Sequence, residues 1–328
     1  MNWNALTPHK KRLDARRPLK PDLVRNLEEW FRVELTYTSN AIEGSTLTRQ
    51  ETAVVLEKGV TVGGRTLREH LEATNHAQAL DMIRKIASDP SHPVGEAEVL
   101  SLHATILKGI DDVNAGRYRS VPVRIAGSTV VLPNPRRVPD LMGEFSSWLR
   151  KSRDLHPAER AAQAHFRLVS IHPFVDGNGR TARLLTNLLL MQGGYPPAII
   201  KTGERMAYLN SLEKAQTGGS QEDYEKLMFK VIDRSLDIYI KAAMGKTSVE
   251  ETVPAEKRLR IGALAKKTGE SVSTIRHWTH EGLLEAVEYT ESGYMLYPIE
   301  AVERVRKIRE MQEKRMSLKE IKEKLNGR

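Results

Sequence analysis

Apolar residues recur at helical spacing along most of the chain, and this pattern predicts a mainly helical fold. Helices are predicted over residues 21–35, 48–58, 66–88, 137–150, 157–171, 179–192, 204–216 and 221–244, and another from about 92 to a stop near Gly109. Residues 39–44, SNAIEG, form the predicted end of a helix that stops at Gly44.

Residues 121–132 carry the strongest strand signal in the body of the chain. Val121, Val123 and Ile125 alternate with other residues, a Gly-Ser turn follows, and three apolar residues at 130–132 precede a proline. Period-two alternation around a turn predicts a short β-hairpin.

The end of the chain has a different pattern. Residues 244–257 are polar, lack periodicity and contain a proline, as expected of a linker. Beyond them a short helix stopped by Gly269, a second helix, a hairpin at 287–298 and two further helices are predicted. The first two have the spacing of a helix-turn-helix, and the hairpin has the place of a wing. We therefore expect regions at 1–94, 95–243, 244–257 and 258–328.

Charge is concentrated at the two ends of the chain. The net charge is +9, and residues 1–20 and 255–328 carry all of it, which points to a polyanion contact outside the body. The chain has no cysteine, which excludes disulfides, thiolate metal sites and cysteine nucleophiles. With neither an apolar leader nor a membrane-spanning run, we expect a cytoplasmic protein without membrane contact.

The candidate catalytic and phosphate-binding residues lie at positions 172–183, HPFVDGNGRTAR. His172 follows a predicted helix and stands at a turn, because Pro173 cannot continue the helix. The next helix begins near Gly179, so the N–H groups of residues 177–179 favour an anion such as a phosphate. Arg180 and Arg183 lie on one face of that helix. Two cations at a helix N-terminus oppose the helix dipole, which is easier to understand if a polyphosphate binds there.

An acid beside the same anion site suggests a metal. Asp176 can hold Mg²⁺ against phosphate oxygens, and His172 has a pKa suited to proton abstraction near neutrality. These residues together predict nucleotidyl or phosphoryl transfer to a hydroxyl.

An EF-hand is excluded because Arg180 and Thr181 stand where its loop needs an oxygen ligand and a glycine. A P-loop lysine and an HExxH zinc motif are also absent.

The motif matches every fixed position of HPFx(D/E)GNGRxxR, so the chain resembles Fic-domain proteins over roughly residues 95–240, including GRYRSVPVRIAGS and LLLMQGGYPP. The resemblance implies a helical fold with one small hairpin, and transfer of AMP from ATP to a Ser, Thr or Tyr hydroxyl of a target protein. Phosphorylating relatives of the Doc type carry Lys at the position of Gly179, which argues against kinase activity.

The resemblance also implies residue roles. His172 is the expected base, Asp176 holds Mg²⁺, and the hairpin at 121–132 is a flap that takes a target segment as an added strand. The expected nucleotide-binding residues are Gly177, Asn178 and Gly179 through their backbone, Arg180 at the β-phosphate region and Arg183 at the γ-phosphate.

A second motif lies far from the first. Ser39 and Glu43 are four residues apart and share a helix face. With Gly44 they fit the family's inhibitory motif (S/T)xxxE(G/N), here ahead of the catalytic core at 95–243. The resemblance implies that Glu43 pairs with Arg183 and denies it to the γ-phosphate, so that the enzyme is autoinhibited.

Residues 258–328 resemble the DNA-binding domain of MerR-type regulators, including EGLL after the second helix and a Gly-Tyr pair in the wing. The resemblance implies a winged helix-turn-helix that binds DNA. By analogy the expected DNA contacts are Ser273, Thr274 and Arg276 in the major groove, and Arg276, His277, Lys266 and Lys267 at phosphates. The chain is too short for the long dimerisation helix of that family, so DNA binding is expected to be weak unless the Fic body forms a homodimer. A basic module used for protein contact is the alternative.

Three functions stay open at this point. The first is an autoinhibited AMP transferase that carries a DNA-binding module. The second is a nucleotide-sensing transcription regulator with little transferase activity, against which the intact motif argues. The third is a transferase that uses UTP or another diphosphate donor, because no residue placed so far contacts the base.

Overall fold

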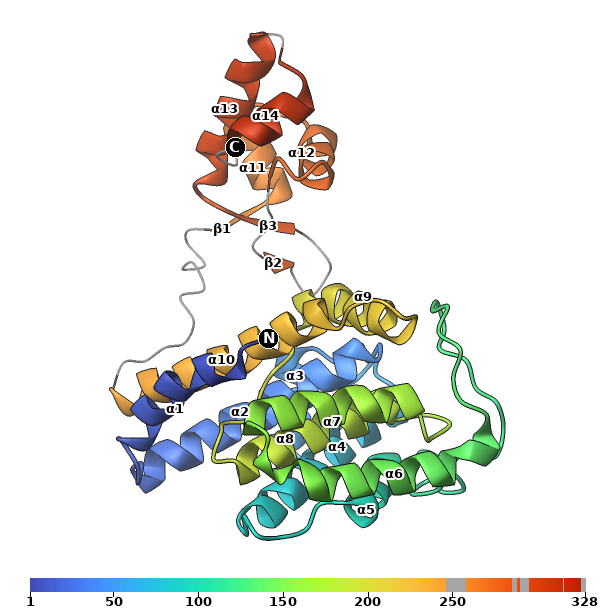
Figure 1. Ribbon diagram of the computed structural model, residues 1–328. Helices are drawn as coiled ribbons and strands as arrows, with labels where there is room; N and C mark the ends of the chain where they lie inside the picture. The colour runs from blue at the N-terminus through green and yellow to red at the C-terminus, as the bar shows by residue number, and fades with distance from the viewer. Residues whose placement is uncertain (246–257, 285–287, 290–294, 315, 326–328) are drawn as a thin grey trace. The chain divides into compact units, whose positions relative to one another are not determined.

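The computed structural model describes residues 1–245, 258–284, 288–289, 295–314 and 316–325. The chain divides into two compact units, Met1–Thr247 and Ser248–Arg328. The first is helical, and the second combines helices with a small sheet (Figure 1). This confirms the expected mainly helical fold class.

The first unit runs from blue to yellow-orange in Figure 1. Its helices are α1 (Thr7–Asp14), α2 (Pro21–Ile42), α3 (Arg49–Lys58), α4 (Leu67–Ala87), α5 (Glu96–Leu107), α6 (Val138–Lys151), α7 (Pro157–Ile171), α8 (Asn178–Gln192), α9 (Arg205–Gln216) and α10 (Glu222–Ala243).

Helix α8 is the centre of this unit. It packs against α2, α4, α5 and α7, and most of its side chains are buried, including the leucines at 184, 185, 188 and 189. Burial on several sides explains its continuous apolar run. Because neighbouring helices hold α8 firmly, its N-terminus is a fixed platform for polar groups brought by those helices.

The starts of α3 and α4 agree with the sequence prediction to within one residue because local capping groups set them, whereas α2 continues beyond the helix predicted at 21–35, without a break, to Ile42. Thr48 and Thr66 each accept a hydrogen bond from the main-chain N–H three residues later, while Glu51 and Glu69 accept from the capping residues in return. Gly44, with a φ of 104°, follows the end of α2 as predicted. Such caps depend on neighbours in sequence alone.

Residues 3–14 are folded, which the sequence analysis did not predict. A 3-10 turn, Trp3–Leu6, leads into α1, which packs along α10 (Figure 1). Trp3, Leu6 and Leu13 are buried in the core of the first unit. That one core also takes side chains from α4 and α5, on either side of the predicted boundary at residue 94.

Residues 121–132, which we call the flap, contain no strand. A turn forms where it was predicted, closed by a hydrogen bond from the N–H of Ser128 to the carbonyl of Ile125 (3.1 Å). No ladder of main-chain hydrogen bonds joins the residues on either side, and the flap is drawn as an excursion away from the helices (Figure 1). The predicted hairpin is therefore right in its turn and wrong in its strand pairing.

The second unit contains a helix-turn-helix. Its helices α11 (Ile261–Thr268) and α12 (Val272–His280) are joined through Gly269, whose φ of 77° is left-handed. Leu264 and Trp278 bury the contact between them. The predicted turn glycine is confirmed, because a left-handed residue is needed to redirect the chain there.

A three-stranded antiparallel sheet completes this unit with α13 (Ala301–Glu313) and α14 (Leu318–Leu325). The predicted wing is the pair β2 (Glu288–Tyr289) and β3 (Met295–Pro298), and β1 (Arg258–Arg260) is an unpredicted third strand on β3. The Gly-Tyr pair expected in the wing and residues 246–257 of the predicted linker lie outside the described residues.

The described helices were compared with the length and apolarity that a bilayer requires. None of them is both long enough and apolar enough to cross a membrane.

Candidate active site

His172 is held at the end of α7 in an uncommon conformation. Its φ is 50°, and it is the one residue other than glycine with a positive φ in the described part of the chain. The ring Nδ1 lies 3.3 Å from the carbonyl of Val169, an acceptor, so Nδ1 donates and Nε2 stays available to accept a proton. Burial lowers the pKa of His172 below its usual value of 6.5, and the imidazole is therefore neutral at neutral pH.

The turn after His172 is locked by side chains. Asn178 accepts a hydrogen bond from the N–H of Phe174 and donates one to its carbonyl, both at 2.9 Å. Phe174 is fully buried and stacks on the ring of His103, with ring centroids 3.6 Å apart. The Asn178 side chain thus shapes the loop, and only its main chain can face an anion.

His103, on α5, was missed by the sequence analysis. It accepts a hydrogen bond from the N–H of Gly116 at Nδ1 (2.9 Å), so Nε2 donates to the carbonyl of Asp176 (3.0 Å). Burial lowers the pKa of His103 to about 4, which keeps this neutral tautomer. A lone histidine on an apolar helix gave no signal that it supports the loop.

Arg183 is 8 % exposed and binds the end of α2. It donates to Glu43 Oε1 (2.7 Å), to the Ser39 hydroxyl (3.0 Å) and to the Ser39 carbonyl (2.9 Å). Burial by itself lowers the pKa of Arg183, but the interactions with Glu43 and Tyr208 together outweigh burial and the net pKa is raised. The predicted contact between the two distant motifs is therefore present.

Glu43 also lies over the N-terminus of α8. A Cβ built on Gly179 would overlap Glu43 Oε1 and come within 3.0 Å of Arg183 Nη1. The glycine therefore leaves room for a carboxylate directly above the first turn of α8, where free N–H groups favour negative charge. In this structure the Glu43 carboxylate lies at the place predicted for a phosphate.

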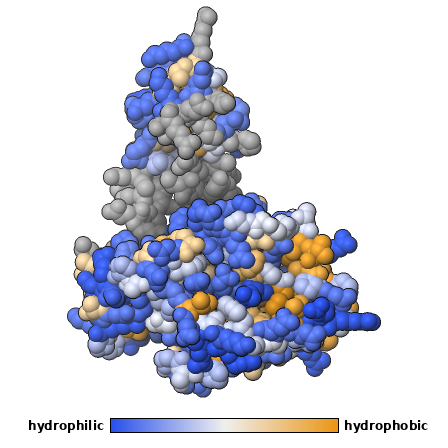
Figure 2. Space-filling view, in the orientation of Figure 1, coloured by the Kyte–Doolittle hydropathy of each residue, from blue (hydrophilic) through white to orange (hydrophobic). Residues whose placement is uncertain are grey.

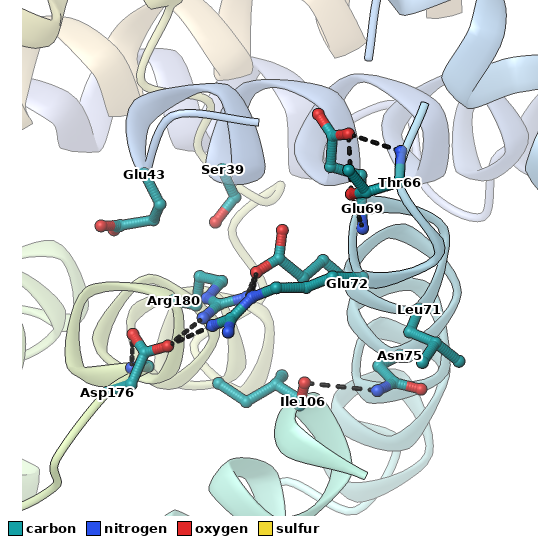
Figure 3. A network of polar contacts seen from close by, with 12 residues as sticks. Ser39, Glu43, Thr66, Glu69, Leu71, Glu72, Asn75, Ile106, Asp176 and Arg180 are labelled. Carbon is teal, nitrogen blue, oxygen red and sulfur yellow. Dashed lines mark hydrogen bonds and ion pairs between the residues drawn. The ribbon is translucent and has the colours of Figure 1, made fainter. Parts of the chain in front are cut away.

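Arg180 is almost fully buried, at 2 % exposed. Its Nη1 lies 3.1 Å from Glu72 Oε1 on α4, and its Nη2 lies 3.4 Å from Asp176 Oδ2 (Figure 3). Glu72 was not predicted, because a glutamate on a helix is usually an exposed acid. It fixes the direction in which Arg180 points.

Asp176 is the most accessible member of the site. Its side chain is 47 % exposed, and Oδ2 accepts a hydrogen bond from Arg68 Nη2 at 2.8 Å. Arg68 also pairs with Glu72 (3.2 Å). No cluster of three or more His, Asp or Glu able to hold a metal exists among the described residues. One hard carboxylate suits Mg²⁺, which prefers one or two carboxylates with phosphates and waters.

The predicted DNA contacts lie on the helix-turn-helix of the second unit. Arg276, His277 and the two lysines of α11 are exposed. Ser271 caps α12 by accepting from the N–H of Thr274 (3.0 Å). Its hydroxyl lies 2.7 Å from the hydroxyls of Ser273 and Thr274, so both of these side chains are hydrogen-bonded to the capping serine.

Comparison with known proteins gives two matches along the chain. Residues 93–190 match the model of the Fic/DOC family, and residues 259–328 match that of MerR HTH family regulatory proteins. The protein adenylyltransferase Fic of Nematostella vectensis is 37 % identical over 207 residues, which are 62 % of this chain and 48 % of that protein. The chain spans about half the length of the curated relatives it matches.

Solved structures share the fold of the first unit. A Fic domain containing signaling protein from Bacteroides thetaiotaomicron superposes with a TM-score of 0.69 at 32 % identity, over 74 % of this chain and 98 % of that one. Fic-1 from C. elegans superposes with a TM-score of 0.67 at 31 % identity, over 74 % of this chain and 73 % of that one.

Proposed function

The chain belongs to the Fic/DOC family, and we propose that its first unit transfers AMP from ATP to a Ser, Thr or Tyr hydroxyl of a target protein. One observation carries the proposal: a neutral histidine, a carboxylate and two buried arginines converge on the N-terminus of a central helix. Curated relatives named adenylyltransferases support the same reaction.

His172 acts as the general base. Its Nε2 takes the proton of the target hydroxyl as the oxygen attacks the α-phosphorus of ATP, and the bond to the departing pyrophosphate breaks. The neutral imidazole that burial maintains is the form that can accept this proton. The bond from Nδ1 to the Val169 carbonyl orients the ring for it.

The remaining groups bind the triphosphate. Main-chain N–H groups of residues 177–179 donate to phosphate oxygens, and that of Gly177 must first leave Asp176 Oδ1, to which it donates in this structure (2.6 Å). Arg180 serves the β-phosphate region, and Arg183 the γ-phosphate. Asp176 is the residue that would hold Mg²⁺, and the ion when bound supplies charge neutralisation at the phosphates. Because Glu72 and Ser39 already orient the two arginines, little rearrangement of those side chains is needed on binding.

Arg68 is expected to compete with the metal. Its bond to Asp176 Oδ2 must open before that oxygen can bind a cation, so Arg68→Gln should lower the Mg²⁺ concentration at half-maximal nucleotide binding. The expected change is about two- to fivefold, the range of a partly exposed ion pair. A fluorescent ATP analogue titrated at several Mg²⁺ concentrations measures it. Arg65→Gln, which breaks a pair with Glu51 instead, is the control, and a raised Mg²⁺ requirement in Arg68→Gln would contradict the competition.

The resting state is autoinhibited. Glu43 fills the space above Gly179 and neutralises Arg183, so ATP must displace a carboxylate before its γ-phosphate can bind. Control therefore acts on nucleotide binding and leaves the base, His172, in place.

The target protein docks on the flap. Val121 and Val131 are exposed on it, and apolar side chains gather on the side of the first unit that carries α9 and the flap (Figure 2). Main-chain groups without a ladder can accept an added strand without requiring one target sequence.

The second unit binds DNA through α11 and α12. Affinity should fall linearly with salt on logarithmic axes, as phosphate contacts require. Arg276→Ala should weaken binding about tenfold, whereas Lys324→Ala, on α14, should leave it unchanged. A gel shift with random-sequence duplex at several salt concentrations measures both. Absence of binding at low salt would instead favour a protein-contact module.

Labelled nucleotides test the enzymatic proposal. The protein with Glu43→Gly is incubated with a cell lysate and either α-labelled or γ-labelled ATP, and labelling above that of the lysate alone is expected only from α-labelled ATP. Labelling above the lysate alone from γ-labelled ATP, with none from α-labelled ATP, would indicate phosphoryl transfer. Nucleotide binding without label on any protein would favour the nucleotide-sensing regulator. Stronger labelling from α-labelled UTP than from α-labelled ATP would identify UTP as the nucleotide donor.

A further inference from the structure

Arg119 connects both ends of the flap to the catalytic turn. It is 3 % exposed. Its guanidinium donates to the carbonyls of Val121 (3.3 Å) and Pro133 (2.6 Å), at the two roots of the flap. Its Nε donates to the carbonyl of His172 (2.8 Å), and its main-chain N–H to that of Pro173 (2.9 Å). Two segments more than thirty residues apart in sequence therefore meet on one side chain.

The charge of Arg119 has no carboxylate partner among the described residues, and all of its acceptors are neutral carbonyls. Burying a cation without a counter-ion is unfavourable, and burial lowers the pKa of Arg119. The rigid fork of a guanidinium can bind several carbonyls at once, which a lysine ammonium cannot do at the same separations. The free-energy cost of burying this charge is thus offset by hydrogen bonds to three carbonyls, a set of contacts that few side chains can make.

Little else holds the flap in place. It has no strand ladder, and its tip is fixed by Glu213, which accepts hydrogen bonds from the N–H and hydroxyl of Thr129, both at 2.8 Å. Those tip bonds are exposed to water, whereas the root bonds of Arg119 are partly buried. The orientation of the flap relative to His172 therefore depends mainly on Arg119.

We propose that Arg119 is a positioning residue that joins the flap to the His172 carbonyl, so that a hydroxyl held along the flap is presented to the imidazole. The junction itself does not depend on the chemistry of the site. Its effect on transfer rests on the proposed function above.

Trypsin tests the junction without any enzymatic activity. Arg124 is an exposed site within the flap, and Arg119→Lys should speed cleavage there about tenfold, the effect expected from losing a hydrogen bond to a charged group. Arg160→Lys is the matched control, because Arg160 is a partly buried arginine that donates to the Leu149 carbonyl, away from the flap. Equal cleavage of the two variants would overturn the proposal.

Enzyme kinetics in the Glu43→Gly background test the consequence. Arg119→Lys should reduce self-modification about tenfold while the ATP affinity changes less than about twofold. If Arg119→Lys lost ATP affinity to the same extent as self-modification, the positioning role would be wrong and Arg119 would have a purely structural role. The same conclusion would follow if neither Arg119→Lys nor Arg119→Gln folded. If the Glu43→Gly parent transfers no label, the proposed function is wrong. The trypsin comparison still tests whether Arg119 joins the flap to the His172 carbonyl.

The pH profile separates charge from geometry. Arg119, Glu43 and Asp176 are the charged groups that act on His172, and the Arg119 charge lowers the pKa of that imidazole. In the Glu43→Gly background, Arg119→Gln should move the acid limb of the transfer profile to higher pH, because a higher pKa protonates the base sooner. Arg119→Lys keeps the charge and should leave the limb in place. Identical shifts in both variants would contradict the positioning role.

Discussion

Replacing Glu43 by glycine is expected to raise AMP transfer, including self-modification, by about tenfold to a hundredfold. In the resting protein Glu43 holds Arg183 at 2.7 Å and lies against Gly179. ATP can bind fully only in the fraction of molecules whose Glu43 has moved away, so its apparent affinity is reduced by that fraction. Because 41 % of the Glu43 side chain is exposed, solvent screens part of the ion pair and favours the lower end of the range.

Two further variants separate charge from occupancy. Glu43→Gln keeps the volume of the side chain and loses the charge, so transfer should rise less than with glycine. Glu57→Gly removes an exposed acid near the end of α3 and serves as the control for an altered helix end. Incorporation of α-labelled ATP per minute is the measurement, and equal labelling by wild type and Glu43→Gly would rule out autoinhibition.

The sequence predicted those parts of the site that depend on neighbours along the chain. Helix ends follow caps such as Thr48 with Glu51, and the turn at His172 follows from Pro173. The Glu43–Arg183 pair joins residues 140 positions apart, and only the resemblance to a family could predict it. Periodicity gives the face of a helix that is buried and leaves its neighbour unspecified.

The groups that orient the site could not be predicted for the same reason. Glu72, Arg68 and His103 lie on α4 and α5, and each looks ordinary in its own helix. Their roles arise because α4 and α5 pack beside α8. A glutamate facing a buried arginine and a glutamate facing water have the same local pattern.

Two sequence predictions failed because a local pattern does not show what a segment packs against: residues 3–14 were not predicted to fold, and the flap was predicted to form paired strands. At residues 3–14 the high charge concealed three apolar anchors, since a count of charges says nothing about which face they leave free. In the flap, alternation predicted paired strands, but alternation shows only that a segment has two faces. The Val121 and Pro133 carbonyls bind Arg119, so acceptors at the flap roots are taken by a side chain.

Replacing His172 by asparagine in the Glu43→Gly background is expected to lower AMP transfer by about a hundredfold to ten-thousandfold, the contribution of a general base. Asparagine tolerates the positive φ of 50° at this position better than alanine does, so the loop should keep its shape. His172→Ala should also abolish detectable labelling. ATP affinity should stay within about twofold in the asparagine variant, since the proposed phosphate contacts lie on residues 177–183.

The acid limb of the pH profile identifies the same group. A base works only while unprotonated, and because burial lowers the pKa of His172 below 6.5, transfer should persist below pH 6.5 and fall as pH drops through the lowered pKa. His156→Asn is the control, since His156 is another partly buried histidine, at the opposite end of α7. Retained transfer in His172→Asn, or an acid limb above pH 6.5, would mean that another group removes the proton. Loss of transfer in His172→Asn together with an unchanged acid limb in His156→Asn would tie the titration to His172, whose Nδ1 donates to the Val169 carbonyl and whose Nε2 is left open.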